Sequence, residues 1–419
     1  MIAEMMVEIR RQTVEQISLT KQEIGKQPMA FATATLPKER QERALRVLLV
    51  TPFFFPNMGG VETHVYEVAR RLARTGVAVT VLTTDRTGRL PAAEQVNGVQ
   101  IQRVRAWPAQ SDYCLAPAMT SIIQRGRWDI VHVQSYHTLV APLAMWAAWR
   151  AQIPYILTFH GGGHSSQVRN QLRVVQHLLL RPLLARAVRL VAVANFEIEF
   201  YRKRLQLPAE RFVHIPNGAD MAKALHPTSH PPDSSLIASV GRLERYKGHQ
   251  RMIAALPHIL QQRPDVRLWI AGAGPYKNEL ERLAATLGVA DRVEIRAVPA
   301  EDRATMAAEL AKAALVTVLS DYETHPIAAL EALALGRPLL VTDTSGLREL
   351  AERGLARAVP LASPASEVAA AVLEQLQHPL LPAALTLPSW DDCARELLLL
   401  YQACVRDVQA PTLECPKLC

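Results

Sequence analysis

The sequence predicts an α/β protein made of two doubly wound domains, each with a parallel sheet covered by helices. Short apolar runs alternate with helical patterns along most of the 419 residues, which is typical of parallel sheets. The alternation stops at residues 225–235, which are rich in proline and small polar residues, and then starts again. Because the chain is longer than one ordinary domain, two domains joined by a linker are the simplest interpretation.

The first half begins with the apolar run 45–51. Apolar residues at helical spacing follow it between residues 61 and 72, and Gly76 is expected to close that helix. The other strands expected in this half are 77–84, 130–133, 155–159, 190–193 and 212–215.

The second half repeats this alternation, and residues 390–405 have the pattern of a strong terminal helix. Its expected strands are 236–240, 266–271, 293–297, 315–319 and 338–342. The expected division of the chain is an extension at 1–43, domains at 44–222 and 223–388, a helix at 389–406 and a tail at 407–419. The extension is expected to be mobile or loosely helical.

The composition favours a soluble globular protein, with 49% hydrophobic and 21% charged residues. No apolar run reaches the roughly 20 residues that span a bilayer. Near the amino terminus, charged residues such as Glu4, Glu8, Arg10 and Arg11 stand where a secretory signal has its apolar core. We therefore expect a cytoplasmic protein.

The chain has five cysteines, an odd number that argues against a disulfide framework in a protein of this size. They are Cys114, Cys393, Cys404, Cys415 and Cys419. Cys415 and Cys419 have no histidine or further cysteine near them in the tail, so no zinc site is expected there. Thiols in a reducing compartment are the plain interpretation.

The net charge of +8 is unevenly distributed. Residues 44–220 hold 20 Lys and Arg against 10 Asp and Glu, a net of +10, whereas residues 221–419 hold 20 against 23, a net of −3. This asymmetry suggests an anionic partner for the first domain. An anionic membrane surface or acceptor fits better than nucleic acid, because no basic stretch is interleaved with stacking aromatic residues.

One segment of the first domain has the composition of a basic amphipathic helix, which is able to lie on anionic lipid. Its arginines stand among leucines and valines; they are Arg169, Arg173, Arg181, Arg186 and Arg189. The alternative is a helix that packs on the core and exposes a solvated basic face.

Residues 241–248 (GRLERYKG) place Arg242 and Lys247 on a loop at the carboxyl end of a predicted strand. Open α/β sheets bind ligands at this edge. A guanidinium offers a fork of donors and an ammonium offers a mobile point charge, so together they suit a diphosphate.

Residues 323–331 (ETHPIAALE) place two glutamates directly after the predicted strand 315–319. Because a helix is expected to begin near Pro326, Glu323 lies on the loop and Glu331 about a turn and a half into the helix. Carboxylates accept hydrogen bonds from hydroxyl groups, and a diphosphate with hydroxyl groups on both sides describes a nucleotide sugar. The alternative is a pair of solvated surface glutamates.

Three glycine-containing turns follow predicted strands. Gly59 and Gly60 precede a helix, where backbone amides favour anions, although a simple turn is the alternative. Gly272 and Gly274 either line a nucleotide or serve the packing of a turn.

His160 ends the predicted strand 155–159 and is followed by three glycines. A position at the carboxyl end of this strand would place it at the interdomain cleft. The alternative is a histidine that satisfies a local backbone contact.

Together these segments resemble glycosyltransferase family 4, the retaining nucleotide-sugar enzymes of the GT-B fold, over about residues 44–405. The most specific parts are Gly241-Arg242-Leu243 with Lys247-Gly248 and the spacing of Glu323 and Glu331. The segments 217–218 (NG), 272–275 (GAGP) and 344–349 (TSGLRE) also look like family positions. Thr324 and Pro326 depart from the family, which often has glycines between the two glutamates, and Pro326 removes a backbone N–H.

The resemblance implies an acceptor domain at 44–222, a donor domain at 223–388 and a last helix that crosses back to the first domain. It implies that Arg242 and Lys247 bind the diphosphate, Glu323 binds hydroxyl groups of the donor sugar and Glu331 binds the ribose. His160 would lie beside the sugar, and Gly59 and Gly60 would approach the phosphate. The further donor-binding positions are Gly241, Gly272, Gly274, His325, Pro326 and Ile327.

The expected reaction is transfer of a hexose, with retention, from a UDP- or GDP-linked donor to a glycan or lipid-linked acceptor. We expect no metal or other cofactor, because two fixed cations can stabilise the departing diphosphate. The enzyme would be peripheral on the inner face of the cell membrane. The alternatives are a non-catalytic nucleotide-sugar-binding or interaction protein, a nucleotide-sugar epimerase and, least favoured, an α-glucan phosphorylase.

Overall fold

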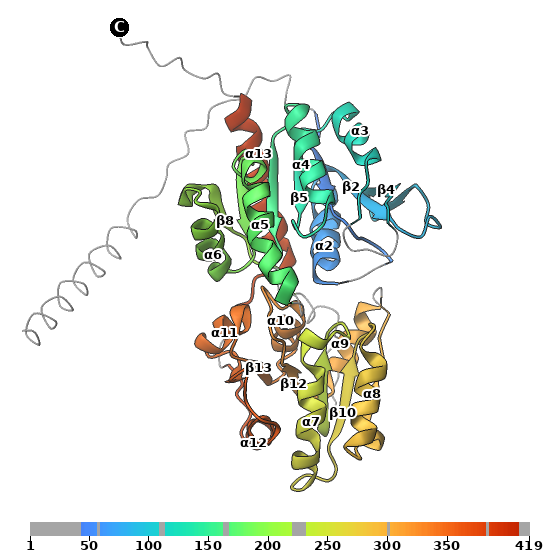
Figure 1. Ribbon diagram of the computed structural model, residues 1–419, viewed down its shortest axis with the longest axis vertical. Helices are drawn as coiled ribbons and strands as arrows, with labels where there is room; N and C mark the ends of the chain where they lie inside the picture. Colours follow the sequence, from blue (N-terminus) through green and yellow to red (C-terminus); the bar gives the residue numbers. More distant parts are fainter. Residues whose placement is uncertain are drawn as a thin grey trace, which may run out of the picture. The chain divides into compact units, whose positions relative to one another are not determined.

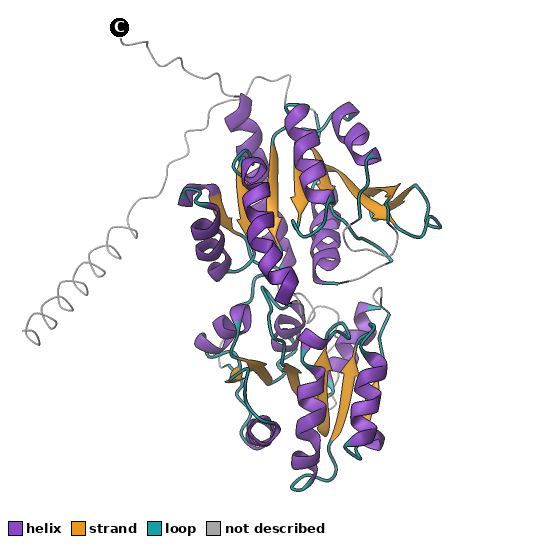
Figure 2. Ribbon diagram, viewed as in Figure 1, coloured by secondary structure: helices purple, strands orange, loops and turns teal. Residues whose placement is uncertain are grey.

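The computed structural model describes residues 43–56, 59–108, 114–161, 167–219, 232–299, 302–382 and 385–409. Two sheets with helices on both faces account for most of these residues (Figures 1 and 2). This confirms the predicted fold class. The extension at 1–42, most of the linker, and Cys415 and Cys419 lie outside the described residues.

The first sheet has eight strands in the order β3-β4-β2-β1-β5-β6-β7-β8. They are β1 (Arg46–Val50), β2 (Ala78–Asp85), β3 (Ala93–Val96), β4 (Val99–Arg105), β5 (Ile130–Gln134), β6 (Tyr155–Phe159), β7 (Arg189–Ala192) and β8 (Phe212–His214). The chain adds strands on one side of β1 and then continues on the other side with β5. The loops after β1 and β5 therefore flank the topological switch point, where doubly wound sheets bind ligands.

The edge of the first sheet was missed in the sequence analysis. Strands β3 and β4 form a hairpin, and β3 is antiparallel to its neighbour. The available signal was Asn97-Gly98, since this dipeptide favours a two-residue hairpin turn with positive φ at both positions. Their φ angles are 50° and 81°.

The second sheet has six strands in the order β11-β10-β9-β12-β13-β14, and all its pairs are parallel. They are β9 (Asp233–Val240), β10 (Arg267–Ala271), β11 (Val293–Ile295), β12 (Ala313–Val318), β13 (Leu339–Thr342) and β14 (Arg357–Val359). Strand β9 begins inside the predicted linker, and β14 was not predicted. The switch point lies between β9 and β12.

The helices connect these strands. They are α2 (Gly60–Arg74), α3 (Ala118–Arg125), α4 (Val140–Arg150), α5 (Gln167–Leu184), α6 (Asn195–Leu205), α7 (His249–Leu260), α8 (Lys277–Thr286), α9 (Arg303–Ala311), α10 (Ile327–Ala334), α11 (Ser345–Glu352), α12 (Ala365–Gln377) and α13 (Trp390–Gln409). Among the described residues, no helix combines the length and the apolar character needed to cross a membrane. The predicted basic helix is shorter than expected: α5 ends at Leu184, so Arg186 and Arg189 lie beyond it.

Strand β1 shows why the sequence has unbroken apolar runs. Val47 and Leu49 belong to the hydrophobic core on one face of the first sheet, and Leu48 and Val50 belong to the core on the other face. Successive side chains of a strand point to opposite faces, so a strand covered on both sides is apolar at every position.

Helix α13 packs against α2 and completes one of these two cores. Trp390, Leu397 and Tyr401 are buried there with residues of β1 and β2. Gly218 allows the close approach, since a Cβ atom at this position would lie 2.1 Å from the backbone nitrogen of Trp390. The last helix of the chain therefore belongs to the core of the first sheet.

Two leucines of α13 provide a matched test of this packing. Leu397 is fully buried and Leu399 is 58% exposed. We expect Leu397→Ala to lower the free energy of unfolding by about 2–5 kcal/mol, because it leaves a cavity in a packed core. Leu399→Ala should change it by less than about 0.5 kcal/mol. Urea unfolding followed by tryptophan fluorescence measures both, and equal effects would contradict the proposed role of α13.

Candidate functional site

The loop after β9 carries both predicted cations and lies against the end of β12. Gly248 has a φ of +78°, and a Cβ atom there would lie only 1.8 Å from the carbonyl oxygen of Leu319. His249 links this loop to β9. Its Nδ1 lies 2.8 Å from the Ser239 hydroxyl, and its Nε2 lies 3.2 Å from the Arg242 carbonyl oxygen. Burial lowers the pKa of His249 to about 4, so its imidazole is neutral at pH 7.

Lys247 and Glu323 meet across the switch point. The Lys247 ammonium donates to Glu323 Oε1 at 2.5 Å, and the Ser320 hydroxyl donates to the same oxygen at 2.8 Å. Burial disfavours the ammonium, but the Glu323 carboxylate and Tyr246 together outweigh this effect and raise the pKa of Lys247. An ammonium has three donors, so Lys247 can hold Glu323 and still donate to a ligand.

Arg242 lies on the same loop and is linked to Lys247 through Tyr246. Its Nη2 donates to the Tyr246 hydroxyl at 3.0 Å, and its Nη1 is 3.2 Å from a Glu244 oxygen. The Lys247 ammonium lies 5.3 Å from the centroid of the Tyr246 ring. The Arg242 side chain is 57% exposed, so its guanidinium is accessible to a ligand. Tyr246 was not among the residues predicted from the sequence.

Residues at the start of α11 hold the Glu323 loop in place. The Glu323 amide donates to the Ser345 hydroxyl at 2.9 Å, and the Gly346 amide donates to the Glu323 carbonyl oxygen at 2.8 Å. A Cβ atom on Gly346 would lie 1.7 Å from the Thr324 carbonyl oxygen. Residues 344–346, which the sequence indicated only through their resemblance to family positions, thus hold Glu323 in place.

Glu331 is placed by α10 and paired with a residue that the sequence analysis missed. Its side chain is buried and forms an ion pair with Arg303, the first residue of α9. Burial raises the pKa of Glu331, and the charge of Arg303 opposes this rise. A buried carboxylate with a partner suits a site that binds hydroxyl groups.

The predicted residues before Glu331 form the beginning of α10. Pro326 is the N-cap residue and Ile327 the first helical residue. Burial lowers the pKa of His325 to about 3, so its ring is uncharged at pH 7. The Ile327 δ-methyl lies 4.0 Å from the position of a Cβ atom on Gly60, so the start of α10 faces the first glycine of α2.

Gly272 and Gly274 lie where the loop after β10 meets the loop after β9. A Cβ atom at Gly272 would be 1.9 Å from the Gly241 carbonyl oxygen, and one at Gly274 would be 2.5 Å from that of Leu243. The space that a side chain would occupy at these two glycines is filled by backbone atoms of the neighbouring loop. This agrees with the alternative that these glycines serve the packing of a turn. Gly241 has a φ of +153° and only side-chain atoms near its own Cβ position.

Gly59 and Gly60 begin α2 without a capping side chain. A Cβ atom on Gly59 would lie 2.7 Å from Glu62 Oε2, so this carboxylate reaches back to the start of the helix. Burial raises the pKa of Glu62, and backbone hydrogen bonds and the charge of Arg242 lower it. Glu62 is a further acidic residue at the site, and it was not among the residues predicted from the sequence.

His160 follows β6, and its Nε2 lies 2.7 Å from Gln134 Oε1 at the end of β5. Its ring is 4.8 Å from that of His64, which in turn contacts Asn217 at 2.8 Å. Burial is the main cause that lowers the pKa of His160, so its ring is neutral. Gly162 and Gly163, which follow it, lie outside the described residues.

Residues next to His160 contact residues next to Glu323. Gly161 has a φ of +63°, and a Cβ atom there would lie 1.4 Å from the Thr324 hydroxyl oxygen. The Phe196 amide donates to Glu349 Oε1 of α11 at 2.9 Å. Thr324, which departs from the family pattern, is thus accommodated by a glycine on the other side of the contact.

The structure therefore groups the predicted residues into two sets. Arg242, Lys247 and Glu323 lie together at the switch point of the second sheet, with Gly241 beside them and Glu331 on α10. His160, Gly59 and Gly60 belong to loops of the first sheet. The packing of Ile327 against the core of the first sheet and the close approach of Thr324 to Gly161 bring the two sets together.

Two family models match consecutive parts of the chain. They are Glycosyltransferase Family 4, over residues 58–223, and Glycosyl transferases group 1, over residues 221–385. The division between them falls in the segment that separates the two sheets.

Similar proteins are transferases of sugar groups. The chain is 26% identical to the GDP-mannose:cellobiosyl-diphosphopolyprenol alpha-mannosyltransferase of Komagataeibacter xylinus, over 87% of this chain and 95% of that protein. It is 27% identical to the D-inositol 3-phosphate glycosyltransferase of Thermobispora bispora, with coverage of 85% and 92%. Among solved structures, the sucrose-phosphate synthase of Thermosynechococcus elongatus has a TM-score of 0.67 at 19% identity, covering 87% of this chain and 97% of that one.

Glu197 gives the contact near Gly161 a measurable pH dependence. Its Oε1 accepts from the Gly161 amide at 2.8 Å and its Oε2 from the Val193 amide at 3.0 Å. Burial raises the pKa of Glu197 from 4.5 to about 8. The folded state therefore keeps this proton where the unfolded state has lost it, so stability falls as the pH rises from about 4.5 to about 8.

We expect Glu197→Gln to flatten the fall in unfolding free energy between about pH 5 and pH 8. Urea titrations of wild type and variant at several pH values measure this difference. Glu210→Gln, at an exposed position of the same domain, serves as the control. Parallel pH profiles for wild type and Glu197→Gln would contradict the raised pKa.

Proposed function

Because this chain belongs to glycosyltransferase family 4, we propose that it moves a hexose from a UDP- or GDP-linked donor to a hydroxyl group of a glycan or lipid-linked acceptor, with retention. The contact of Lys247 with Glu323 carries the proposal. It joins a cation suited to a diphosphate and a carboxylate suited to sugar hydroxyl groups at one switch point. The donor diphosphate binds at Arg242 and Lys247, and Glu331 holds the ribose.

The reaction breaks the bond between the anomeric carbon and the β-phosphate oxygen and forms a bond from that carbon to the acceptor oxygen, and the proton of the acceptor hydroxyl passes to the departing diphosphate. Negative charge grows on the departing diphosphate, so fixed cations at that position stabilise the transition state. Arg242 is accessible, and Lys247 is held by Glu323, so both are in place before the donor binds. We propose that these two cations replace a metal ion and that no other cofactor takes part.

His160 and Glu323 complete the proposed sugar-binding side. The neutral imidazole of His160 has one nitrogen engaged by Gln134, which fixes the orientation of the ring. A neutral ring next to the anomeric carbon can exchange hydrogen bonds with the sugar without repelling the positive charge that develops on it. Acceptor attack from the face that the diphosphate leaves would give retention.

The acceptor is proposed to be lipid-linked and the enzyme peripheral on the inner face of the membrane. One similar protein is a transferase whose name specifies a diphosphopolyprenol acceptor. Helix α5 exposes Leu178 and Leu179, at 69% and 71%, and Arg181 lies one turn further on. The side chains of Arg169 and Arg173 lie outside the described residues. The mixed apolar and basic character of α5 supports contact with anionic lipid.

The donor is tested by thermal-shift measurements with UDP, GDP, ADP and their common sugars. A ligand at roughly one hundred times its dissociation constant stabilises the folded state by about 2.7 kcal/mol. We expect a shift with one nucleotide class, lost in Lys247→Ala because the diphosphate loses its buried cation. Lys277→Ala removes a half-exposed lysine of the same domain and should keep the shift. No shift with any member of the panel would favour the non-catalytic alternative.

Chelation tests the absence of a metal. If Arg242 and Lys247 alone neutralise the diphosphate, EDTA leaves the nucleotide-induced thermal shift unchanged, and added Mg²⁺ does not increase it. A shift that disappears with EDTA and returns with a divalent ion would contradict metal independence while leaving the nucleotide class intact. Donor consumption without any acceptor, with conversion to an isomeric nucleotide sugar, would instead support an epimerase.

A further inference from the structure

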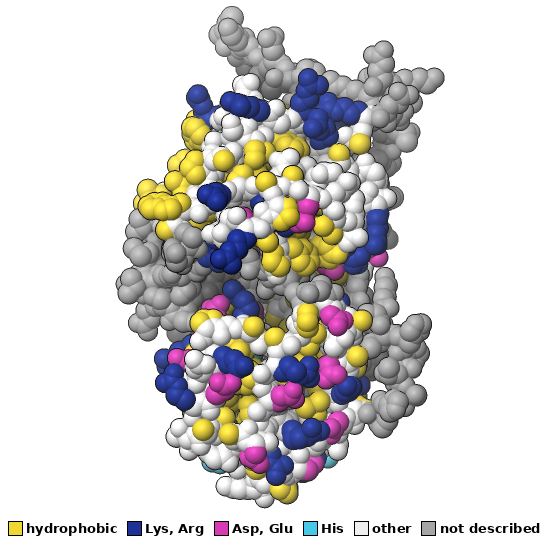
Figure 3. All heavy atoms as spheres, turned by 90° about the vertical axis from the view of Figure 1, so that its right-hand side faces the viewer, with side chains coloured by type: hydrophobic (Ala, Val, Ile, Leu, Met, Phe, Trp, Pro, Cys, Tyr) yellow, Lys and Arg dark blue, Asp and Glu magenta, His cyan; other side chains and the backbone are white. Residues whose placement is uncertain are grey.

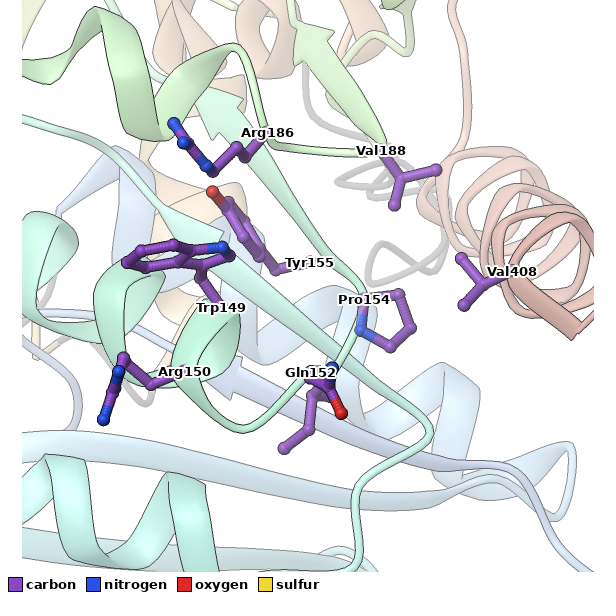
Figure 4. Close-up of a pocket in the computed structure, with 9 residues that line it drawn as sticks. Trp149, Arg150, Gln152, Pro154, Tyr155, Arg186, Val188 and Val408 are labelled. Atoms are coloured by element: carbon purple, nitrogen blue, oxygen red, sulfur yellow. The ribbon is translucent and has the colours of Figure 1, made fainter.

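A groove of about 540 Å³ lies at the edge of the first sheet opposite to His160 (Figure 4). It is formed by the end of α4, the start of β6, the turn after α5 and the last part of α13. Its walls include Trp149, Arg150, Tyr155, Arg186, Val188 and Val408. Tyr155 opens β6 and His160 follows the end of this strand, so the two sites are separated by the length of the strand, roughly 16 Å.

The two arginines of the groove give it the chemistry of an anion site. Neither Arg150 nor Arg186 has a carboxylate partner within 4 Å among the described residues, whereas the nearby Arg189 pairs with Asp407 at 3.7 Å. The Arg186 guanidinium lies 5.0 Å from the centroid of the Trp149 ring, and its Nη1 donates to the Pro182 carbonyl oxygen at 2.7 Å. Arg186 is thus held in place with its charge uncompensated.

The wall between these arginines is apolar and aromatic. The Trp149 side chain is 44% exposed, and Figure 4 shows it beside Tyr155 and Arg186, with Val188 and Val408 further along the groove. Trp rings with one apolar part and one polar edge suit the boundary between lipid and water. Figure 4 shows Arg150 and Arg186 on opposite sides of Trp149, so a phosphate group at either arginine and an acyl chain near the apolar residues would satisfy both parts of the groove.

The groove continues into an exposed apolar face formed by α4 and α5. Trp146 lies one turn before Trp149 on α4 and is 42% exposed. Leu178 and Leu179 are the most exposed leucines of this face, and α5 packs beside α4. Figure 3 shows one side of the molecule, with hydrophobic side chains gathered on part of its upper half and with Lys and Arg mixed with Asp and Glu over its lower half.

Helix α5 connects this face to the catalytic side. It begins at Gln167, just after the loop that follows His160, and ends at Leu184, just before Arg186. Eighteen helical residues span about 27 Å, so a flat surface touching the outer side of α5 would reach from the groove to the edge of the catalytic site.

We propose that this groove binds the phosphate headgroup of an anionic phospholipid and that the α4–α5 face lies on the membrane around it. The proposal rests on the proposed function in one respect: a lipid-linked acceptor in that membrane would reach the catalytic side along α5. The net charge of +10 on residues 44–220 complements an anionic bilayer. Soluble phosphate compounds carry the same phosphate group as a lipid headgroup. The experiments below therefore compare vesicles with inorganic phosphate and glycerol phosphate.

The test is sedimentation of the full chain with vesicles of phosphatidylcholine alone or mixed with phosphatidylglycerol. We expect binding to the anionic vesicles only, and we expect the double variant Arg150→Gln/Arg186→Gln to bind them roughly tenfold or more weakly. The double variant Arg125→Gln/Arg127→Gln removes the same charge from exposed positions of the same domain and should bind nearly as wild type. Equal losses in the two variants would overturn the groove site.

Tryptophan fluorescence provides a second measurement. Brominated lipid acyl chains should quench the fluorescence of wild type, and the quenching should decrease in Trp149→Phe, because this ring enters the lipid. Inorganic phosphate or glycerol phosphate should not release the protein from vesicles. Release by these soluble anions, or quenching unchanged in Trp149→Phe, would contradict insertion at the groove.

Both groove variants should retain the nucleotide-induced thermal shift, since neither residue belongs to the catalytic site. A nucleotide-induced shift in wild type, together with vesicle binding that does not differ between the groove and control variants, would refute the lipid site alone. Vesicle binding that depends on the groove, without any nucleotide shift in wild type, would refute the proposed donor chemistry and keep the lipid site.

Discussion

The contact between Lys247 and Glu323 is the interaction on which the candidate site depends. It joins the loops after β9 and β12, the two strands on either side of the switch point of the second sheet. Each partner would be costly to bury alone, and their pairing lets both charges persist in a mostly buried position. Gly248 and Ser345 then fix the two loops from either side through backbone approach and a hydrogen bond.

Around this pair, burial keeps the histidines of the site neutral, whereas the arginine and lysine side chains stay charged. His160, His249 and His325 are all kept uncharged, because burial lowers their pKa values. These histidines therefore add no positive charge at neutral pH, and the cations among the site residues are Arg242, Lys247 and Arg303, of which Arg303 is paired with Glu331. A site built in this way has a fixed positive charge for a diphosphate and neutral donors and acceptors for a sugar.

The two sheets contribute unequally to the proposed reaction. The second sheet supplies the cations and both glutamates, whereas the first sheet supplies His160, the start of α2 and the excess of basic residues. Helix α13 ties the end of the chain into the core of the first sheet through Leu397 and Tyr401. One consequence is that Val408, near the end of that helix, lines the groove proposed to bind lipid.

The pattern of apolar runs and turns was sufficient to predict the two doubly wound sheets and the positions of the loops that carry Arg242, Lys247 and Glu323. It could do so because a strand buried on both faces has to be apolar throughout, as in β1, and because parallel strands place their ligand-binding loops at one edge. The hairpin of β3 and β4 could have been predicted from Asn97-Gly98. It was missed because its strands have weaker apolar runs. The pairs of residues that contact each other became known only from the folded structure: Tyr246 with Arg242, Arg303 with Glu331, and Thr324 with Gly161. These contacts join segments that are distant in the sequence or depend on side-chain direction, and no local periodicity encodes either property.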